Sequence, residues 1–124
     1  ALAAAPCTII ASTSAFTDDA LLPRLVTIAE KHGSRIVLPS GAIGGIDAIA
    51  SAATLVLDSV VHEIVKPPVA WKGTQAETLL DLDALTERKV FFTGNARDAA
   101  SRYPQNANAT VVTSLAGIGC RPNE

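Results

Sequence analysis

A glycine-rich turn is the segment of this sequence whose residue types most directly suggest ligand binding. Residues 40–45, Ser-Gly-Ala-Ile-Gly-Gly, lie between a short β-branched run and a run with helical spacing. Small side chains at the start of a helix leave backbone N–H groups open to an anion or a carboxylate. Close packing of the helix on a sheet explains these glycines equally well, and their spacing matches neither the dinucleotide G-x-G-x-x-G pattern nor a P-loop.

Amide and lysine side chains form a second set of candidate ligand contacts. Asn106 and Asn108 follow Pro104 at the start of a predicted helix. Their amides can cap that helix or contact a polar group such as a nicotinamide carboxamide, and the spacing alone favours capping. Lys66 and Lys72 are candidate anion contacts, although surface lysines are usually solvated.

The histidines and cysteines indicate neither a catalytic constellation nor a metal site. His32 falls at a predicted helix end and His62 in a predicted β segment, so structural roles are favoured for both. Cys7 and Cys120 are too far apart for a zinc knuckle and make no disulfide framework. A reducing, cytoplasmic location is therefore expected.

The elements that must position these residues follow an α/β order. The sequence predicts a buried strand at 7–11, a helix capped by Thr17 and ended by Gly33, a second buried strand at 35–38, and a small-residue helix over 46–53. A strand–helix–strand–turn–helix order is typical of an α/β fold with parallel neighbouring strands.

The second half of the chain mixes predicted strands and helices. A mostly β segment over 54–65 ends at Lys66-Pro67-Pro68, because proline cannot donate to a ladder. Beyond it the predicted elements are a helix over 74–80, a further turn over 83–86, a strand over 89–94, and helices over 96–102 and 106–116.

Composition limits the class of protein. The 124 residues are enough for one domain, and with aromatics at 4% the core must be built from Ala, Val, Ile and Leu. The net charge of -2 and the absence of a basic half argue against nucleic-acid binding. Apolar runs fall short of the ~20 residues of a membrane helix. The chain has no Met, which favours an internal piece of a longer protein.

Several segments, in a compatible order, resemble blocks of the L-aspartate dehydrogenase family. They run from about Pro6 to Gly119, and the ordered set is more specific than any single block. The matched blocks are S-G-A-I-G-G-x-D-A at 40–48, K-P-P and a following Gly at 66–73, G-x-A-R-D/E-A at 94–99, F/Y-P-x-N-x-N at 103–108 and S-L-A-G-x-G at 114–119.

The resemblance implies an enzyme that oxidises L-aspartate to iminoaspartate with NAD or NADP. Iminoaspartate then hydrolyses to oxaloacetate and ammonia, or feeds NAD biosynthesis. The implied architecture is the end of a Rossmann-type dinucleotide-binding domain in 1–38, joined to part of a mixed-sheet α/β catalytic and dimerisation domain in 39–124, in a homodimer. Ala42 and Asn108 match cofactor-contacting positions of the family, and residues 12–15 resemble a turn close to the nicotinamide.

Departures from the family pattern leave alternatives open. The nucleotide fingerprint is expected before residue 1, and the catalytic histidine is expected after residue 119, a place that neither His32 nor His62 occupies. Val65 stands where an arginine is common, and residues 120–124 do not resemble the family's continuation. No catalytic residue is therefore assigned. The chain could instead be a truncated relative that only binds or assembles, or a dehydrogenase for another amino acid.

Overall fold

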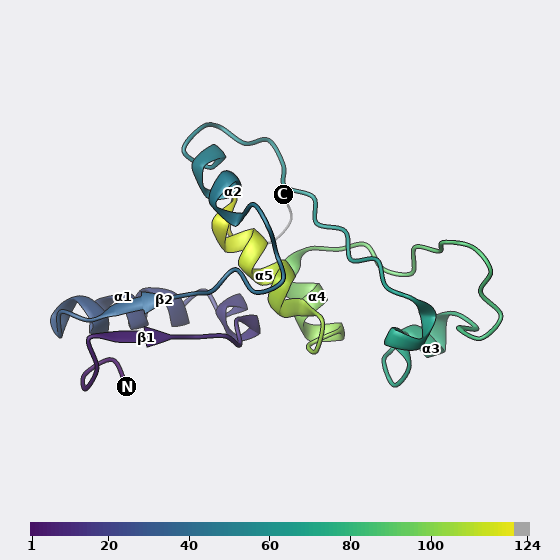
Figure 1. Cartoon of the computed structure of the whole chain (residues 1–124), viewed down its shortest axis with the longest axis horizontal. Helices are drawn as coiled ribbons and strands as arrows, with labels where there is room; N and C mark the ends of the chain where they lie inside the picture. The colour runs from purple at the N-terminus through teal and green to yellow at the C-terminus, as the bar shows by residue number, and fades with distance from the viewer. Residues whose placement is uncertain (121–124) are drawn as a thin grey trace.

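The chain begins with a β–α–β unit. In the computed structural model, which describes residues 1–120, strand β1 (Cys7–Ile9) pairs in parallel with β2 (Arg35–Val37). Helix α1 (Leu21–Lys31) makes the crossover, and a 3-10 turn, η1 (Ser14–Thr17), lies between β1 and α1 (Figure 1). Parallel strands require a crossover of this kind. The predicted α/β fold is confirmed in this part of the chain.

The start of α1 differs from the prediction. Thr17 does not cap the helix, because its hydroxyl donates to the carbonyl oxygen of Ser14 at 2.8 Å and closes η1. The helix begins at Leu21, so Asp18 and Asp19 precede its first turn. Asp18 instead accepts a hydrogen bond from the backbone N–H of Ala20 at 2.9 Å.

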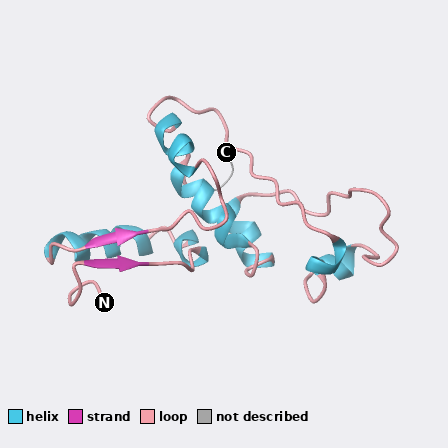
Figure 2. Ribbon diagram, in the orientation of Figure 1, coloured by secondary structure: helices cyan, strands magenta, loops and turns pink. Residues whose placement is uncertain are grey.

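The sheet is more exposed than two buried strands would be. Ile9 and Val37 are 68% and 41% exposed. Figure 2 shows the two strands side by side with a helix along them. Since successive side chains of a strand point to opposite faces, one helix can cover only half of them. The prediction of fully buried strands is therefore wrong in this structure.

Three helices form the middle of the molecule: α2 (Ile46–Ala52), α4 (Ala96–Arg102) and α5 (Ala107–Ala116). Helix α5 contacts both α2 and α4, and it also contacts η1 from the first part of the chain (Figure 1). Asn95 caps α4 by accepting a hydrogen bond from the N–H of Asp98 at 2.8 Å, which is the favoured role of asparagine at this position. These three helices confirm the sequence prediction.

Two long extended segments lead to a small outer lobe. The lobe contains the 3-10 turn η2 (Pro68–Trp71) and the short helix α3 (Ala76–Leu79). The prediction of strands over 54–65 and 89–94 is wrong, because within residues 1–120 neither segment forms a ladder. The further turn expected over 83–86 does not form a helix. Val56 and Val61 are 96% and 80% exposed. Alternating side chains favour an extended backbone, but a strand also needs a partner for its N–H and C=O groups.

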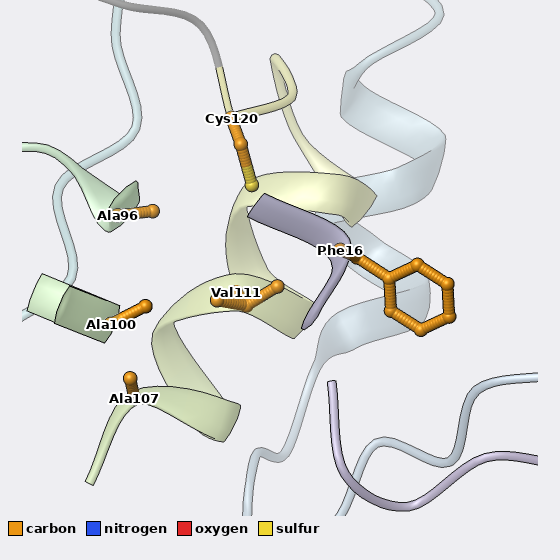
Figure 3. Packing of buried hydrophobic residues seen from close by; sticks show 6 residues of the cluster. All are labelled: Phe16, Ala96, Ala100, Ala107, Val111 and Cys120. Carbon is orange, nitrogen blue, oxygen red and sulfur yellow. The ribbon is translucent and has the colours of Figure 1, made fainter. Parts of the chain in front are cut away.

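Two hydrophobic clusters hold these parts together. The Phe16 cluster joins η1 to α4 and α5, and consists of Phe16, Ala96, Ala100, Ala107, Val111 and Cys120 (Figure 3). The aromatic cluster holds the outer lobe against the end of α4. It consists of Trp71, Ala76, Leu82 and Tyr103, with Phe91 and Phe92 packed against them.

The aromatic cluster overturns the expectation of an aliphatic core. The chain has three Phe, one Trp and one Tyr, and all of them except Phe16 belong to this cluster. Their rings meet edge to face with centroids 4.9 to 6.0 Å apart, the arrangement that aromatic quadrupoles favour. A small number of aromatic side chains can therefore form a core when their rings are packed together.

Phe16 anchors η1 in the buried cluster that it shares with α4 and α5, so its truncation tests this packing. The side chain is 4% exposed, and Phe16→Ala should lower the free energy of unfolding by about 3–5 kcal/mol, through lost burial and a cavity. Urea denaturation followed by circular dichroism measures the change. Ile9→Ala is the control, because Ile9 is 68% exposed and should change stability by about 0.5 kcal/mol. Equal losses in the two variants would contradict this role of Phe16.

Candidate functional site

Asn108 in the first turn of α5 is hydrogen-bonded to the turn that follows β1. Its Oδ1 accepts from the backbone N–H of Thr13 at 3.0 Å and of Ser14 at 3.2 Å. The hydroxyl of Thr13, a residue that is 1% exposed, donates to the main-chain oxygen of Asn108 at 2.9 Å. The structure thus brings together residues 12–15 and Asn108, which the sequence places 94 and 95 positions apart.

A salt bridge reinforces the same junction. The guanidinium of Arg97 on α4 lies 2.7 Å from the carboxylate of Asp19, measured from Nη2 to Oδ1. The same nitrogen donates to the main-chain oxygen of Cys120 at 3.2 Å. Both side chains of the salt bridge are partly exposed, so the ion pair itself adds about 0–1 kcal/mol. Its contribution is to orient α4 relative to the segment before α1.

The predicted capping of α5 by the two amides is wrong. Asn106 occupies the N-cap position but makes no side-chain cap hydrogen bond. Its Oδ1 accepts from the ammonium group of Lys66 instead, and Oδ1 of Asn108 accepts from Thr13 and Ser14. Both amide oxygens therefore bind groups outside the helix.

The two asparagines face different sides of α5. Two residues correspond to a rotation of about 200° along an α-helix. Asn108 faces η1, whereas Asn106 and Thr113 face the extended segment 60–66 through Lys66 and His62. The amides are adjacent in sequence but belong to different environments.

The lysines differ in their contacts. Lys66 lies over the indole ring of Trp71, with Nζ 5.6 Å from the ring centroid. Lys72 pairs with Asp83 at 2.6 Å, and the hydrogen bond to that carboxylate raises the pKa of Lys72. Lys72 therefore already has an anionic partner within the chain.

The glycine-rich turn is open rather than packed. Gly41 and Gly45 have φ of 62° and 74°, which non-glycine residues rarely adopt. Gly44 has no positive φ, and a Cβ built on any of the three glycines meets nothing within 4 Å. The packing explanation for these glycines is therefore wrong in this structure. Ala42 lies in the same turn and is exposed.

A cavity of about 650 Å³ lies between the extended segments 60–66 and 85–94. Its lining includes His62, Lys66, Trp71, Tyr103 and Asn106, and it includes neither Ala42 nor Asn108. The Tyr103 hydroxyl is buried without a hydrogen-bond partner in the described part of the chain. Tyr103 and Thr13 fall within the matched block 103–108 and the turn 12–15, but no sequence pattern assigned either side chain a role of its own.

His62 has the structural contacts expected of it. Its Nδ1 lies 3.0 Å from the hydroxyl oxygen of Thr113, and that hydroxyl donates to the carbonyl of Ala109 at 3.0 Å. A hydroxyl has one proton, so Nδ1 of His62 carries the proton and donates. Burial lowers the pKa of His62 because it disfavours the charged imidazolium.

Residues 1–120 contain neither a membrane-spanning helix nor a cluster of metal-binding side chains. Over residues 1–120, none of the helices combines the length and the apolar character needed to cross a membrane. In the same part of the chain, no three His, Cys, Asp or Glu side chains are grouped so that they could hold a metal ion. Residues 121–124, part of the segment 120–124 that does not resemble the family's continuation, lie outside the described residues.

The lowered pKa of His62 predicts a pH dependence of stability. The folded state favours neutral imidazole, so this stabilisation is present above the unfolded pKa of about 6.5 and is lost as pH falls through the lower folded pKa. His62→Asn keeps a neutral donor and should flatten the fall in the free energy of unfolding just below that pH. His32→Asn is the control, since His32 is exposed. The measurement is denaturation at a series of pH values. If the free energy of unfolding of both variants fell with pH as that of the unsubstituted protein does, the assignment to His62 would be wrong.

Comparisons with known proteins give consistent results. A family model described as aspartate dehydrogenase, C-terminal, matches residues 47–122. The L-aspartate dehydrogenase of Brucella anthropi is 54% identical over 110 residues, covering 89% of this chain. That of Cupriavidus necator is 49% identical over 114 residues, covering 92% of this chain.

A solved structure resembles the whole arrangement. The crystal structure of aspartate dehydrogenase from Thermotoga maritima matches 92% of this chain with a TM-score of 0.68 at 29% identity, and the match covers 44% of that protein. The chain spans 41% and 42% of the length of the Brucella and Cupriavidus relatives. The similarity thus concerns about two fifths of each longer protein.

Proposed function

The chain belongs to the aspartate dehydrogenase family, and on this basis we propose that the protein carrying it oxidises L-aspartate to iminoaspartate with NAD or NADP. When bound, the cofactor would supply the acceptor for the hydride lost from the α-carbon of L-aspartate, and the amino nitrogen would release a proton. Iminoaspartate would then hydrolyse to oxaloacetate and ammonia or feed NAD biosynthesis. The 54% identity to a named L-aspartate dehydrogenase over 89% of the chain carries this proposal.

Ala42 and Asn108 are the proposed cofactor contacts. The turn around Ala42 fits a bound cofactor because a Cβ on Gly44 would enter open space, and glycine permits close approach of the backbone to a ligand. Asn108 fits because its oxygens are used by Thr13 and Ser14, which leaves its NH₂ group to donate. The role of these residues is to bind and orient the cofactor, since orientation of the reactants supplies much of the rate.

The proposed division of the chain is the end of a dinucleotide-binding domain in 1–38 and part of a catalytic and dimerisation domain in 39–124. The parallel β1–β2 pair supports the first assignment. The match of the C-terminal family model to residues 47–122 supports the second. Exposed Val56, Val61 and Val90 support a homodimer, because apolar surface of this kind is commonly buried on association. A cytoplasmic location is part of the same proposal.

Cofactor reduction tests the activity. The absorbance of reduced nicotinamide should rise when the protein, at its full natural length, is mixed with L-aspartate and NAD or NADP. It should not rise when any one component is omitted. Other amino acids serve as comparison substrates, and exclusive turnover of one of them would contradict the assignment to aspartate. A folded protein that binds cofactor without any turnover would favour the alternative of a binding or assembly role.

Gly44→Ala tests the open turn. Gly44 lacks a positive φ and has open space around it, so alanine should leave the melting temperature unchanged or slightly raised, because Gly→Ala at a compatible site adds about 0.4–1 kcal/mol. Its methyl group should nevertheless weaken cofactor binding several-fold in a fluorescence titration with NADH. Ser51→Ala, an exposed change on α2, is the matched control. Unchanged NADH affinity in Gly44→Ala would argue against the cofactor lying on this turn.

A further inference from the structure

We propose that Thr13 is a positioning residue that locks the amide of Asn108 as a hydrogen-bond donor toward the cofactor. This inference rests on the proposed function, because it concerns how the proposed cofactor contact is oriented. Three hydrogen bonds carry it: Thr13 N–H and Ser14 N–H to Oδ1 of Asn108, and the Thr13 hydroxyl to the main-chain oxygen of Asn108.

The two backbone donors determine which way the amide faces. An asparagine side chain has one oxygen that accepts and one NH₂ that donates. The N–H groups of Thr13 and Ser14 converge on one end of the Asn108 amide at 3.0 and 3.2 Å. In a flipped amide, the NH₂ group would face the N–H groups of Thr13 and Ser14, and donors cannot bond to one another. Each buried donor left without an acceptor would cost about 1–3 kcal/mol. The oxygen therefore points to the turn and the NH₂ points away from it.

The Thr13 hydroxyl keeps those donors in place. It is part of a 1% exposed side chain, and its bond to the Asn108 carbonyl anchors the turn to the backbone of α5. A β-branched side chain has few χ1 rotamers, so little entropy is lost when the hydroxyl is held in one geometry. Phe16, three residues later, secures the other end of the turn in the Phe16 cluster. The turn can therefore shift relative to Asn108 only if a part-buried hydrogen bond or the buried Phe16 ring is displaced.

A donor-only amide selects an acceptor on the ligand. The recognised group is a neutral oxygen acceptor, such as the carboxamide oxygen of nicotinamide or a ribose hydroxyl oxygen. Thr13 does not need to touch the ligand to affect this selection. Loss of its hydroxyl removes the bond to the Asn108 main-chain oxygen, so that the turn can shift and its two N–H groups no longer hold the Asn108 Oδ1. The amide can then flip and present its oxygen to an acceptor.

Matched variants of the full-length protein separate these roles. Thr13→Ser keeps the hydroxyl and Thr13→Ala removes it, while both lose the same methyl group; Thr13→Val retains the side-chain shape without the hydroxyl. Asn108→Asp keeps an acceptor for both N–H groups and removes the NH₂. The measurements are thermal melting, the affinity for NADH, and the relative affinities for the thionicotinamide and acetylpyridine analogues of NAD.

The expected affinities follow from the loss of one hydrogen bond. Asn108→Asp should weaken NADH binding about 3–10-fold, the equivalent of about 0.7–1.4 kcal/mol. Thr13→Ala and Thr13→Val should weaken it several-fold, and Thr13→Ser should bind as the unsubstituted protein does. Equal affinities of the Ser and Ala variants, with Asn108→Asp still weakened, would overturn the positioning role and leave the cofactor contact intact. Unchanged affinity in Asn108→Asp would overturn the cofactor contact itself.

The analogues show whether Asn108 donates the hydrogen bond and which group of the cofactor accepts it. Acetylpyridine keeps a carbonyl oxygen, whereas thionicotinamide replaces that oxygen with a weakly accepting sulfur. If Asn108 donates to the carboxamide, the preference for the oxygen analogue should shrink toward parity in Thr13→Ala and Asn108→Asp. An unchanged preference together with weaker NADH binding would identify a ribose hydroxyl as the acceptor and retain the role of Thr13. If Thr13→Val does not fold, the Ser and Ala pair still decides between these outcomes.

Discussion

The arrangement of the molecule depends on the attachment of η1 to helix α5. Phe16 belongs to one buried cluster with residues of α4 and α5, the turn before it binds Asn108 through backbone N–H groups, and Arg97 forms a salt bridge with Asp19. The burial of one aromatic ring positions the turn, and the hydrogen bonds then set its register on the helix. The β–α–β unit and the three central helices therefore meet at a contact that combines apolar burial with directional bonds.

Helix α5 provides a different set of contacts on its other side. Lys66 binds Asn106, and His62 binds Thr113, so the extended segment 60–66 follows the helix axis. The aromatic cluster then holds the outer lobe at the end of this segment. The cavity beside it is lined by the Asn106 side of the helix, and the proposed cofactor contact is on the Asn108 side. The two halves of the chain thus use one short helix as their common support.

Local patterns in the sequence predicted the helices well and the tertiary partners poorly. A helix ended by Gly33 was predicted and α1 ends at Lys31, although its start at Leu21 lies beyond the expected cap at Thr17. The alternation in 54–65 indicated an extended backbone but could not supply a hydrogen-bonding neighbour, so no ladder forms there. The ordered blocks identified the family, and Ala42 and Asn108 remain proposals as cofactor contacts. The bond from Thr13 to Asn108 spans 95 positions, and no local pattern encodes such a contact.

The two-sided use of α5 constrains how the chain can change in length. One residue inserted between Asn106 and Thr113 would rotate the following side chains by about 100° and break the hydrogen bonds on one side of the helix or the other. The segment around Val56, which is 96% exposed, has no such restriction, because lengthening a surface loop costs only about 0.6 kcal/mol for each doubling. Insertions and deletions among relatives should therefore accumulate in that loop, while the first two turns of α5 keep a constant length.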